Sequence, residues 1–143
     1  HARAHLYRAL LEGTAYSFRH IRENFTKRGV EVSQVIACGG GAQSTLWMQI
    51  MSDVIGYDLI IPSMATGSEI GSAYLAAKGT GLIDDIESFL LNRRQENAHT
   101  VKADRENHLR YGELYRIYLD LYEHTKTDMW ALAGLTENAL NIE

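Results

Sequence analysis

The sequence predicts an α/β fold organised around one short parallel βαβ unit. An apolar run over residues 30–37 ends in three consecutive glycines, and a helical pattern begins at Thr45. A second apolar run over residues 58–62 follows that helix and ends at Pro62, the only proline of the chain. Two strands joined through one helix imply a parallel pair with a right-handed crossover. The 143 residues are enough for one domain with its own core.

The composition narrows the function classes. The formal net charge of -4, with no basic stretch to offset it, argues against a nucleic-acid-binding surface. No apolar run approaches the ~20 residues that cross a bilayer, and no signal-peptide pattern is visible. Cys38 is the only cysteine and cannot form an internal disulfide, so a cytoplasmic location is the simplest expectation. Its place at the end of an apolar run predicts a buried, inert thiol.

The first predicted element is a long amphipathic helix over residues 4–27. The chain opens with His1 and is helical almost at once, which indicates a piece of a larger protein. Apolar residues recur at three- and four-residue steps and form one stripe, with most of the charged residues off it. The stripe consists of Tyr7, Leu10, Leu11, Ala15, Phe18, Ile21 and Phe25. Gly29 ends the helix, and the continuous apolar end of the strand over 30–37 predicts cover on both of its faces.

Two further helices belong to the predicted βαβ unit and its continuation. The helix over residues 45–55 carries apolar side chains on its buried side and stops at Gly56. The helix over 68–78 is rich in small residues, which predicts close packing of its backbone against a neighbouring element. These small residues are Gly71, Ser72, Ala73, Ala76 and Ala77.

The pattern after residue 82 predicts a helical region. We expect a short helix over 84–91, a polar loop over 92–101, a helix over 104–126 and a last helix over 127–140. An aromatic stripe on the third of these segments predicts core or half-buried packing. The stripe consists of Tyr111, Leu114, Tyr115, Tyr118, Leu121 and Tyr122.

The glycine turn (residues 39–44) is the strongest candidate for a binding site. Three successive glycines favour unusual dihedral angles or the close approach of the backbone to another group. A helix N-terminus after such a turn can hold a phosphate or a nucleotide, but a plain connector between strand and helix has the same pattern. Gly39, Gly41 and Ser44 fit only a loose dinucleotide-binding motif, because no acidic residue follows the second strand. A Walker-type phosphate loop is excluded because no Gly-Lys-Ser/Thr follows.

Catalytic and metal-ligating patterns are weak. His1 and His5 share a helical spacing without a third ligand, and the histidines are expected to face solvent. Ser44 has no histidine partner in its sequence context, so no catalytic residue and no metal site are predicted. Gln49 and Asp53 are either braces for the glycine turn or ordinary polar positions of the helix.

A family resemblance covers residues 7–122. The segment over 38–56, CGGGAQSTLWMQIMSDVIG, closely resembles the adenosine-binding segment of the FGGY carbohydrate kinases. Three further segments are similar to the same family in the same order, which is far more specific than the glycines alone. They are residues 8–15 (RALLEGTA), residues 68–81 (SEIGSAYLAAKGTG) and the tyrosine-rich residues 111–122.

The resemblance implies an actin-like ATPase fold of the ribonuclease H-like class and gives the turn residues roles. Gly40 and Gly41 would pass under the adenine and ribose of ATP, Ser44 would contact the base, and Gly39 and Ala42 would shape the turn. The chain would be part of a single C-terminal nucleotide-binding domain. Its parts would be a helix over 1–29, an adenosine-binding core over 30–81 and a helical region over 82–143.

The function implied by the resemblance is transfer of the γ-phosphoryl group of ATP, with Mg²⁺, to a sugar or polyol hydroxyl. A pentulose such as xylulose is favoured, and the sugar would be held by an N-terminal domain outside this chain. No carboxylate here matches the family's catalytic aspartate, so the chain alone is expected to be inactive. A homodimer of the longer protein is compatible with this reading. An actin-like scaffold without sugar chemistry and a Rossmann-type dinucleotide binder remain the alternatives.

Overall fold

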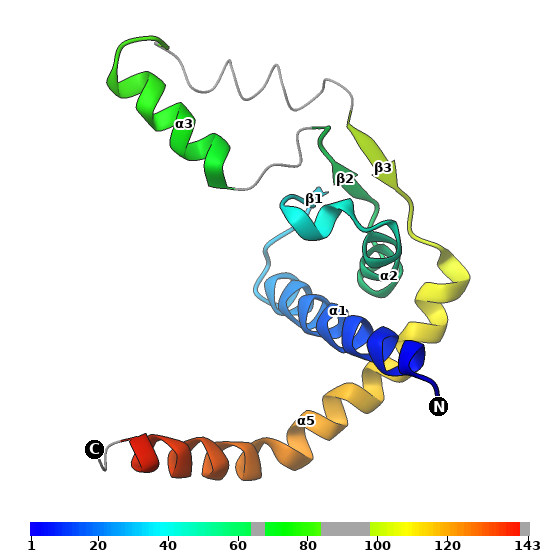
Figure 1. Ribbon diagram of the computed structural model, residues 1–143. Coiled ribbons are helices and arrows are strands. Elements are labelled where there is room, and N and C mark those ends of the chain that lie inside the picture. The colour runs from blue at the N-terminus through cyan, green and yellow to red at the C-terminus, as the bar shows by residue number, and fades with distance from the viewer. Residues whose placement is uncertain (64–67, 84–97, 141–143) are drawn as a thin grey trace.

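The structure, a computed structural model, describes residues 1–63, 68–83 and 98–140. A small sheet lies beside helix α2, and two long helices, α1 and α5, cross on the other side of α2 (Figure 1). The elements in chain order are α1 (Arg3–Lys27), β1 (Val35–Ile36), the 3₁₀ helix η1 (Gly40–Gln43), α2 (Thr45–Ile55), β2 (Leu59–Ile61), α3 (Ser68–Gly79), β3 (His99–Val101) and α5 (Arg105–Leu140). The predicted helix over 84–91 lies outside the described residues.

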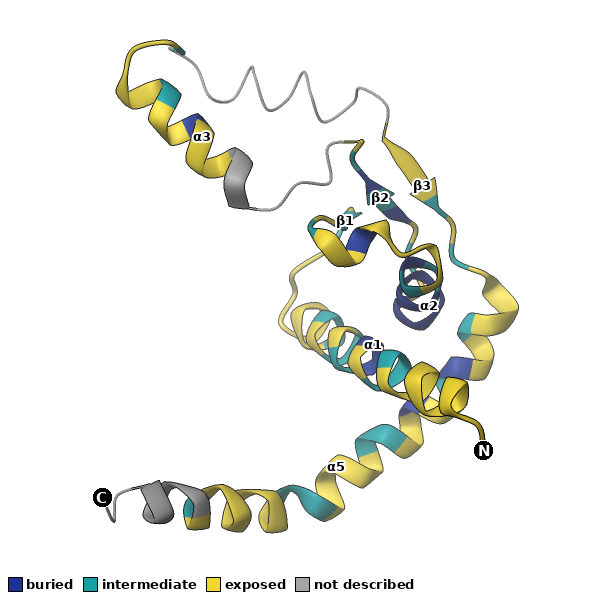
Figure 2. Cartoon of the chain, in the orientation of Figure 1, coloured by how far each residue is buried: buried dark blue, intermediate teal, exposed yellow. Residues whose placement is uncertain are grey.

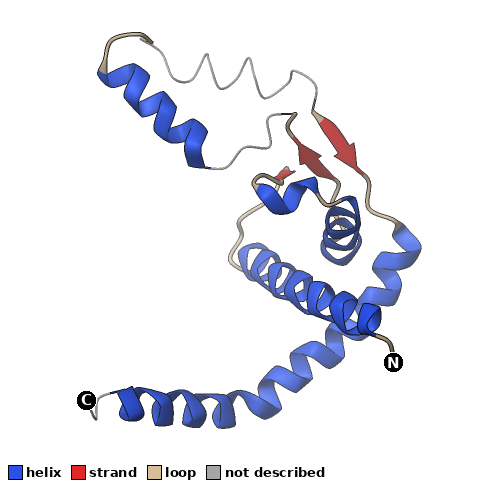
Figure 3. Ribbon diagram, viewed as in Figure 1, coloured by secondary structure: helices blue, strands red, loops and turns tan. Residues whose placement is uncertain are grey.

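The sheet has the strand order β1-β2-β3 and is mixed (Figure 3). β1 and β2 are parallel with Val35 opposite Leu59, which confirms the predicted βαβ unit. β3 is antiparallel to β2, with His99 opposite Ile61. The expectations of a purely parallel sheet and of a loop through residues 99–101 are therefore wrong. The three residues of β3 are mostly exposed, so this strand is set by backbone pairing with β2 and not by an apolar pattern.

The strand predicted over residues 30–37 is much shorter than expected. Only Val35 and Ile36 pair as strand, opposite a β2 that is itself three residues long. Both residues are half-buried. One further bond, from the Ala37 N–H to the Ile60 carbonyl at 2.9 Å, continues the pairing. The thiol of Cys38 is exposed, so the prediction of a buried cysteine is also wrong.

Helix α2 forms the centre of the core (Figure 2). The predicted bounds over 45–55 are confirmed, and all residues from Met48 to Ile55 except Gln49 are buried. Gly56 ends the helix in the left-handed conformation with φ 77°. The Ser52 hydroxyl donates to the Tyr57 carbonyl at 2.8 Å, which ties the end of α2 to the approach of β2.

Helix α1 meets the rest of the described chain with a mixed face that includes only Leu11 and Ala15 of its predicted apolar stripe. Leu10 is 68% exposed and Phe18 is 47% exposed, whereas Ala15 and Tyr16 are buried. On the inward side, the Tyr111 hydroxyl donates to Glu12 at 2.9 Å and the Tyr115 hydroxyl donates to Glu23 at 3.2 Å. Because α5 satisfies these carboxylates with hydroxyl groups, a polar helix face can serve as an interface.

Helix α5 is one continuous helix, so the predicted break at residue 127 is wrong. No glycine or proline lies near that position to end a helix. The predicted packing of the tyrosines is confirmed for Tyr111, Tyr115 and Tyr118, whose rings lie within 6.2 Å of the Tyr16 ring, measured between centroids. The leucines of the same stripe, Leu114 and Leu121, are exposed.

Helix α3 stands apart from the sheet and from α2 (Figure 1). Its predicted bounds over 68–78 are confirmed to within one residue. The small residues Gly71, Ala73 and Ala76 are exposed, so the close packing predicted for them is not observed. No helix within residues 1–63, 68–83 and 98–140 has both the length and the apolar character needed to span a membrane.

Candidate functional site

The glycine turn connects β1 to α2, as predicted, and its first residue has a conformation reserved for glycine. Gly39 has φ 87° and ψ -179°, a region that side chains with a Cβ do not adopt without strain. A Cβ on Gly40 would meet no atom within 4 Å, so the space beside this residue is open. A Cβ on Gly41 would lie 3.4 Å from the Trp47 ring. The three glycines therefore serve different purposes.

The second half of the turn fixes the start of α2. The Ala42 N–H donates to the Gly39 carbonyl at 3.1 Å, and the buried methyl group of Ala42 anchors the turn in the core. Ser44 is the N-cap of α2, since its hydroxyl accepts the Trp47 N–H at 3.3 Å. The structure brings Gly39, Gly40, Gly41 and Ser44 together at the surface and turns the Ala42 side chain inward.

Asp53 occupies the opposite end of α2 and does not brace the glycine turn. Its Oδ1 accepts the Gln49 amide at 2.7 Å and the Asp104 N–H at 2.9 Å. Its Oδ2 accepts the Asn107 amide at 3.0 Å, and the residue is only 3% exposed. Both sequence interpretations of Asp53 are therefore wrong. This buried carboxylate joins the end of α2 to the first turn of α5, where the helix dipole favours a negative charge.

His108 is tied to the same end of α2. Its Nδ1 lies 2.8 Å from the Asp53 carbonyl oxygen and must donate, because a carbonyl only accepts. The ring is half-buried, so the prediction that this histidine faces solvent is wrong. A Cβ on Gly56 would lie 2.4 Å from the His108 Cε1, so His108 also requires a glycine at the end of α2.

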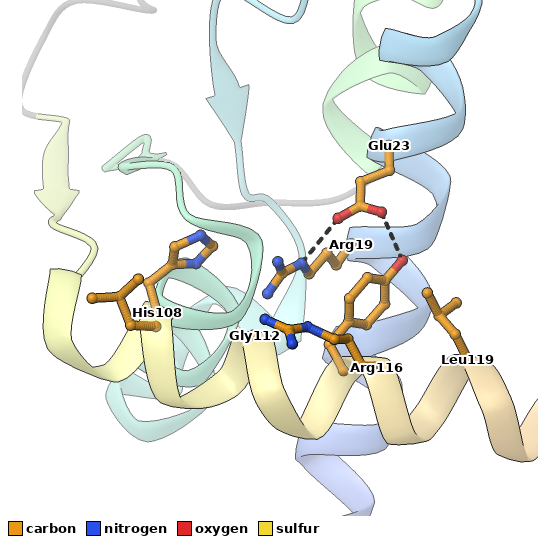
Figure 4. A pocket seen from close by; sticks show the side chains of 8 residues that line it. Arg19, Glu23, His108, Gly112, Arg116 and Leu119 are labelled. Carbon is orange, nitrogen blue, oxygen red and sulfur yellow. Dashed lines mark hydrogen bonds and ion pairs between the residues drawn. The ribbon is translucent and has the colours of Figure 1, made fainter.

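A pocket of about 370 Å³ lies between α1 and α5, near the C-terminal end of α2 (Figure 4). It is lined by Arg19, Glu23, His108, Leu109, Gly112, Tyr115, Arg116 and Leu119. The sequence reasoning missed this pocket. The signal was present on α5, where His108, Gly112 and Arg116 are spaced by four residues and so share one helix face.

Arg19 contacts several groups around this pocket. Its Nε donates to Glu23 at 3.1 Å, and its guanidinium carbon lies 4.4 Å from the centre of the Tyr115 ring. Burial, followed by the nearby Glu23 charge, raises the pKa of Tyr115 to about 12. The phenol therefore stays neutral at physiological pH and donates a hydrogen bond to Glu23.

Metal-ligating side chains do not gather in the described part of the chain. No group of three His, Cys, Asp or Glu residues there is arranged to hold a metal ion. His1 and His5 lie together at the start of α1, with ring centroids 6.0 Å apart, and both are exposed.

Comparison with known proteins identifies the family. The profile of the FGGY family of carbohydrate kinases, C-terminal domain, matches residues 1–80. The chain belongs to the FGGY family of carbohydrate kinases. A xylulose kinase from Bacillus subtilis is 32% identical over 142 residues, which are 96% of this chain and 28% of that protein. A ribulokinase from Mycolicibacterium smegmatis is 37% identical over 119 residues, 82% of this chain and 21% of its own length.

The fold agrees with that of solved FGGY kinases. The crystal structure of xylulose kinase from Rhodospirillum rubrum matches with a TM-score of 0.69 and 31% identity, covering 89% of this chain and 26% of that chain. The predicted actin-like ATPase fold is confirmed, and the dinucleotide-binding alternative is set aside. This chain spans about a quarter of the length of the relatives that it matches.

Proposed function

We propose that this chain is the later part of the C-terminal domain of an ATP-dependent pentulose kinase, and that the glycine turn receives the adenosine of ATP. The observation that carries the proposal is the open space beside Gly40 at the start of α2, in a family of carbohydrate kinases. A purine needs a flat surface without side chains, and the backbone of Gly40 and Gly41 offers one.

Ser44 contributes a hydrogen bond to the base in this proposal. Its oxygen already accepts the Trp47 N–H, so the hydroxyl proton is free to donate to a ring nitrogen of adenine. Gly39 holds the turn in its unusual conformation, and Ala42 anchors it. The phosphates, Mg²⁺, the sugar and the catalytic base are held mainly by residues outside this chain. We therefore propose that the chain alone transfers no phosphoryl group.

The reaction of the longer protein would be transfer of the γ-phosphoryl group of MgATP to a pentulose hydroxyl. Such transfer depends on positioning, on neutralisation of charge by the metal and on a base for the hydroxyl. Xylulose is the first substrate to test, because a relative that covers 96% of this chain is a xylulose kinase. Ribulose is the second, because of the ribulokinase match.

Titration of the ¹⁵N-labelled chain with adenosine tests the binding site directly. We expect adenosine, without phosphates, to shift the amide signals of residues 39–44. Gly40→Val should remove this response without lowering the thermal midpoint, because the added side chain enters open space. Gly134→Val is the matched control on α5, where a Cβ also meets no neighbour. Shifts that survive Gly40→Val would contradict the proposed site.

Phosphorylation assays test the reaction. A longer protein that contains this chain should consume ATP with xylulose or ribulose, and Gly40→Val should abolish that activity. Failure on every sugar while ADP still binds would favour an actin-like scaffold. Sugar phosphorylation by residues 1–143 alone, abolished by Gly40→Asp, would contradict the proposed inactivity of the chain.

A further inference from the structure

The pocket between α1 and α5 is lined by charged side chains that have no role in the proposed adenosine site. Two guanidinium groups, from Arg19 and Arg116, reach into it from different helices (Figure 4). We propose that this pocket is a second ligand site that binds a phosphate group, either as free phosphate or as the phosphate of an ester. This inference does not depend on the proposed adenosine site.

Arg116 is the free cation of the pocket. No other side chain or carbonyl in the described residues forms a hydrogen bond or ion pair with it, and it is exposed. Every other arginine that lies in or beside the pocket is already engaged. Arg19 and Arg22 both approach Glu23, at 3.1 Å and 3.5 Å. Arg116 thus brings a positive charge that the pocket itself does not balance.

Glu23 does not oppose an anion strongly, because its charge is already compensated. One of its oxygens accepts from Arg19 and the other accepts from the neutral Tyr115 hydroxyl at 3.2 Å. These contacts place the Arg19 guanidinium over the Tyr115 ring, with its carbon 4.4 Å from the ring centre. A planar guanidinium that is held in place offers paired N–H donors to a phosphate, and this geometry favours phosphate over a single point charge.

Gly112 keeps the Arg19 guanidinium accessible from the pocket. A Cβ on Gly112 would lie 3.9 Å from the Arg19 Nη2 and 4.0 Å from its Nη1. Those are ordinary contact distances, so a methyl group would fit there without strain and would cover the donors. A glycine inside a helix costs roughly 0.5–1 kcal/mol relative to alanine, and here it leaves a space of functional value.

His108 completes the wall of the pocket on α5. Its Nδ1 donates to the Asp53 carbonyl, and its other ring nitrogen forms no hydrogen bond within the described residues. The volume of about 370 Å³ is sufficient for a small phosphorylated molecule. Arg19 and His108 both contact carbonyls of the last turn of α2, at Val54 and Asp53. The pocket therefore lies about 16 Å, the length of α2, from the glycine turn.

Titration of the ¹⁵N-labelled 143-residue chain with inorganic phosphate, at ionic strength held constant with NaCl, tests the site. We expect saturable shifts of the Gly112 amide and of the Arg19 and Arg116 side-chain signals. Ribose 5-phosphate forms the second arm, and ribose alone is the ligand control. Tighter binding of the ester than of phosphate assigns the site to phosphate esters, and equal binding assigns it to free phosphate.

Three variants distinguish a specific phosphate site from non-specific attraction of phosphate to a positively charged surface. Arg116→Gln should weaken phosphate binding about tenfold, since a charged hydrogen-bonding partner is lost. Gly112→Ala should weaken it by at least as much while leaving the thermal midpoint equal or higher. Arg110→Gln removes a charge from an exposed position of the same helix and should change affinity less than twofold. Equal weakening by Arg110→Gln, or unchanged binding in both Arg116→Gln and Gly112→Ala, would overturn the proposal.

Discussion

The two ends of helix α2 are built in opposite ways. At its N-terminal end the glycine turn is exposed, and the Ser44 hydroxyl is the only side chain of the turn with a hydrogen bond among those found in the described residues. At its C-terminal end the buried Asp53 carboxylate accepts from three partners, and Ser52 joins Tyr57 to β3. In the described residues, the side-chain hydrogen bonds of α2 are concentrated at its C-terminal end, and the N-terminal end is exposed.

This difference separates stability from binding along one helix. Removing a buried carboxylate that accepts from three donors should cost several kcal/mol of folding free energy, because these hydrogen bonds to a charged group are lost. Substitutions in the exposed glycine turn should cost little folding free energy, except where the backbone conformation requires glycine. Substitutions at the C-terminal end should therefore affect mainly folding, and those at the N-terminal end mainly ligand binding.

The largest effect is expected for Asp53→Ala. It removes the acceptor of the Asp104 N–H and the Asn107 amide, and one of two acceptors of the Gln49 amide, which also donates to the Lys102 carbonyl at 3.0 Å. It should therefore lower the free energy of unfolding by about 3 kcal/mol, measured by urea denaturation. Asp58→Ala is the matched control, because Asp58 is exposed and accepts only the Ala103 N–H, at 3.0 Å. It should cost about 1 kcal/mol. Equal losses of unfolding free energy in the two variants would show that the buried Asp53 contributes no more to stability than the exposed Asp58.

Gly56→Ala should have the second largest effect. The left-handed backbone disfavours a Cβ, and here the methyl group would also displace the His108 ring, for a total loss of about 2–3 kcal/mol. Gly29→Ala at the end of α1 has the same φ of 77° but no neighbour within 4 Å. It should cost about 1–2 kcal/mol. Urea unfolding of both variants gives two losses of unfolding free energy, and their difference is the cost of displacing the His108 ring. Equal losses would show that the His108 contact costs nothing.

Gly39→Ala should lower the free energy of unfolding by about 2 kcal/mol, because its backbone lies in a region that only glycine occupies readily. The neighbouring Gly40→Ala should change it by less than about 0.5 kcal/mol, as an exposed substitution into open space. Urea denaturation of Gly39→Ala and Gly40→Ala shows whether the stability of the turn depends on glycine at both positions or only at Gly39. A large loss for Gly40→Ala would contradict the open space beside it.

Ser44→Ala should lower the free energy of unfolding by less than Gly39→Ala does. Loss of the N-cap costs about 1 kcal/mol, whereas Ser44→Gly should cost only a few tenths of a kcal/mol. Both variants lack the hydroxyl, so both should weaken adenosine binding to a similar degree in the titration described above. Binding that follows the stability loss instead of the hydroxyl would show that Ser44 acts only as a cap.

Local patterns predicted the parts of the fold that local forces determine. The apolar content of α2 and the glycine that ends it are both visible in the sequence, and the structure confirms them. The role of Asp53 was hidden, because its partner Asp104 is 51 positions away and nothing near Asp53 points to it. β3 was hidden for a related reason, since the polar His99 and Thr100 become a strand only through their pairing with β2.

The orientation of α1 shows the limit of periodicity. The stripe through Leu10 and Phe18 was visible, but periodicity does not say which surface will meet the neighbouring helix. Two tyrosine hydroxyls on α5 decide that question by satisfying Glu12 and Glu23. The pocket of Figure 4 depends on the same helix pair, so it could not be placed before the pairing was known.

The pairing of β2 with β3 has a consequence for how this chain can vary. Ile61 pairs with His99, so the chain leaves the sheet at the end of β2 and returns to it at the adjacent start of β3. Doubling the length of such an excursion costs only about 0.6 kcal/mol of closure entropy. Insertions or deletions between β2 and β3, outside the family-like segment over 68–81, can therefore be accommodated without shifting either end of α2.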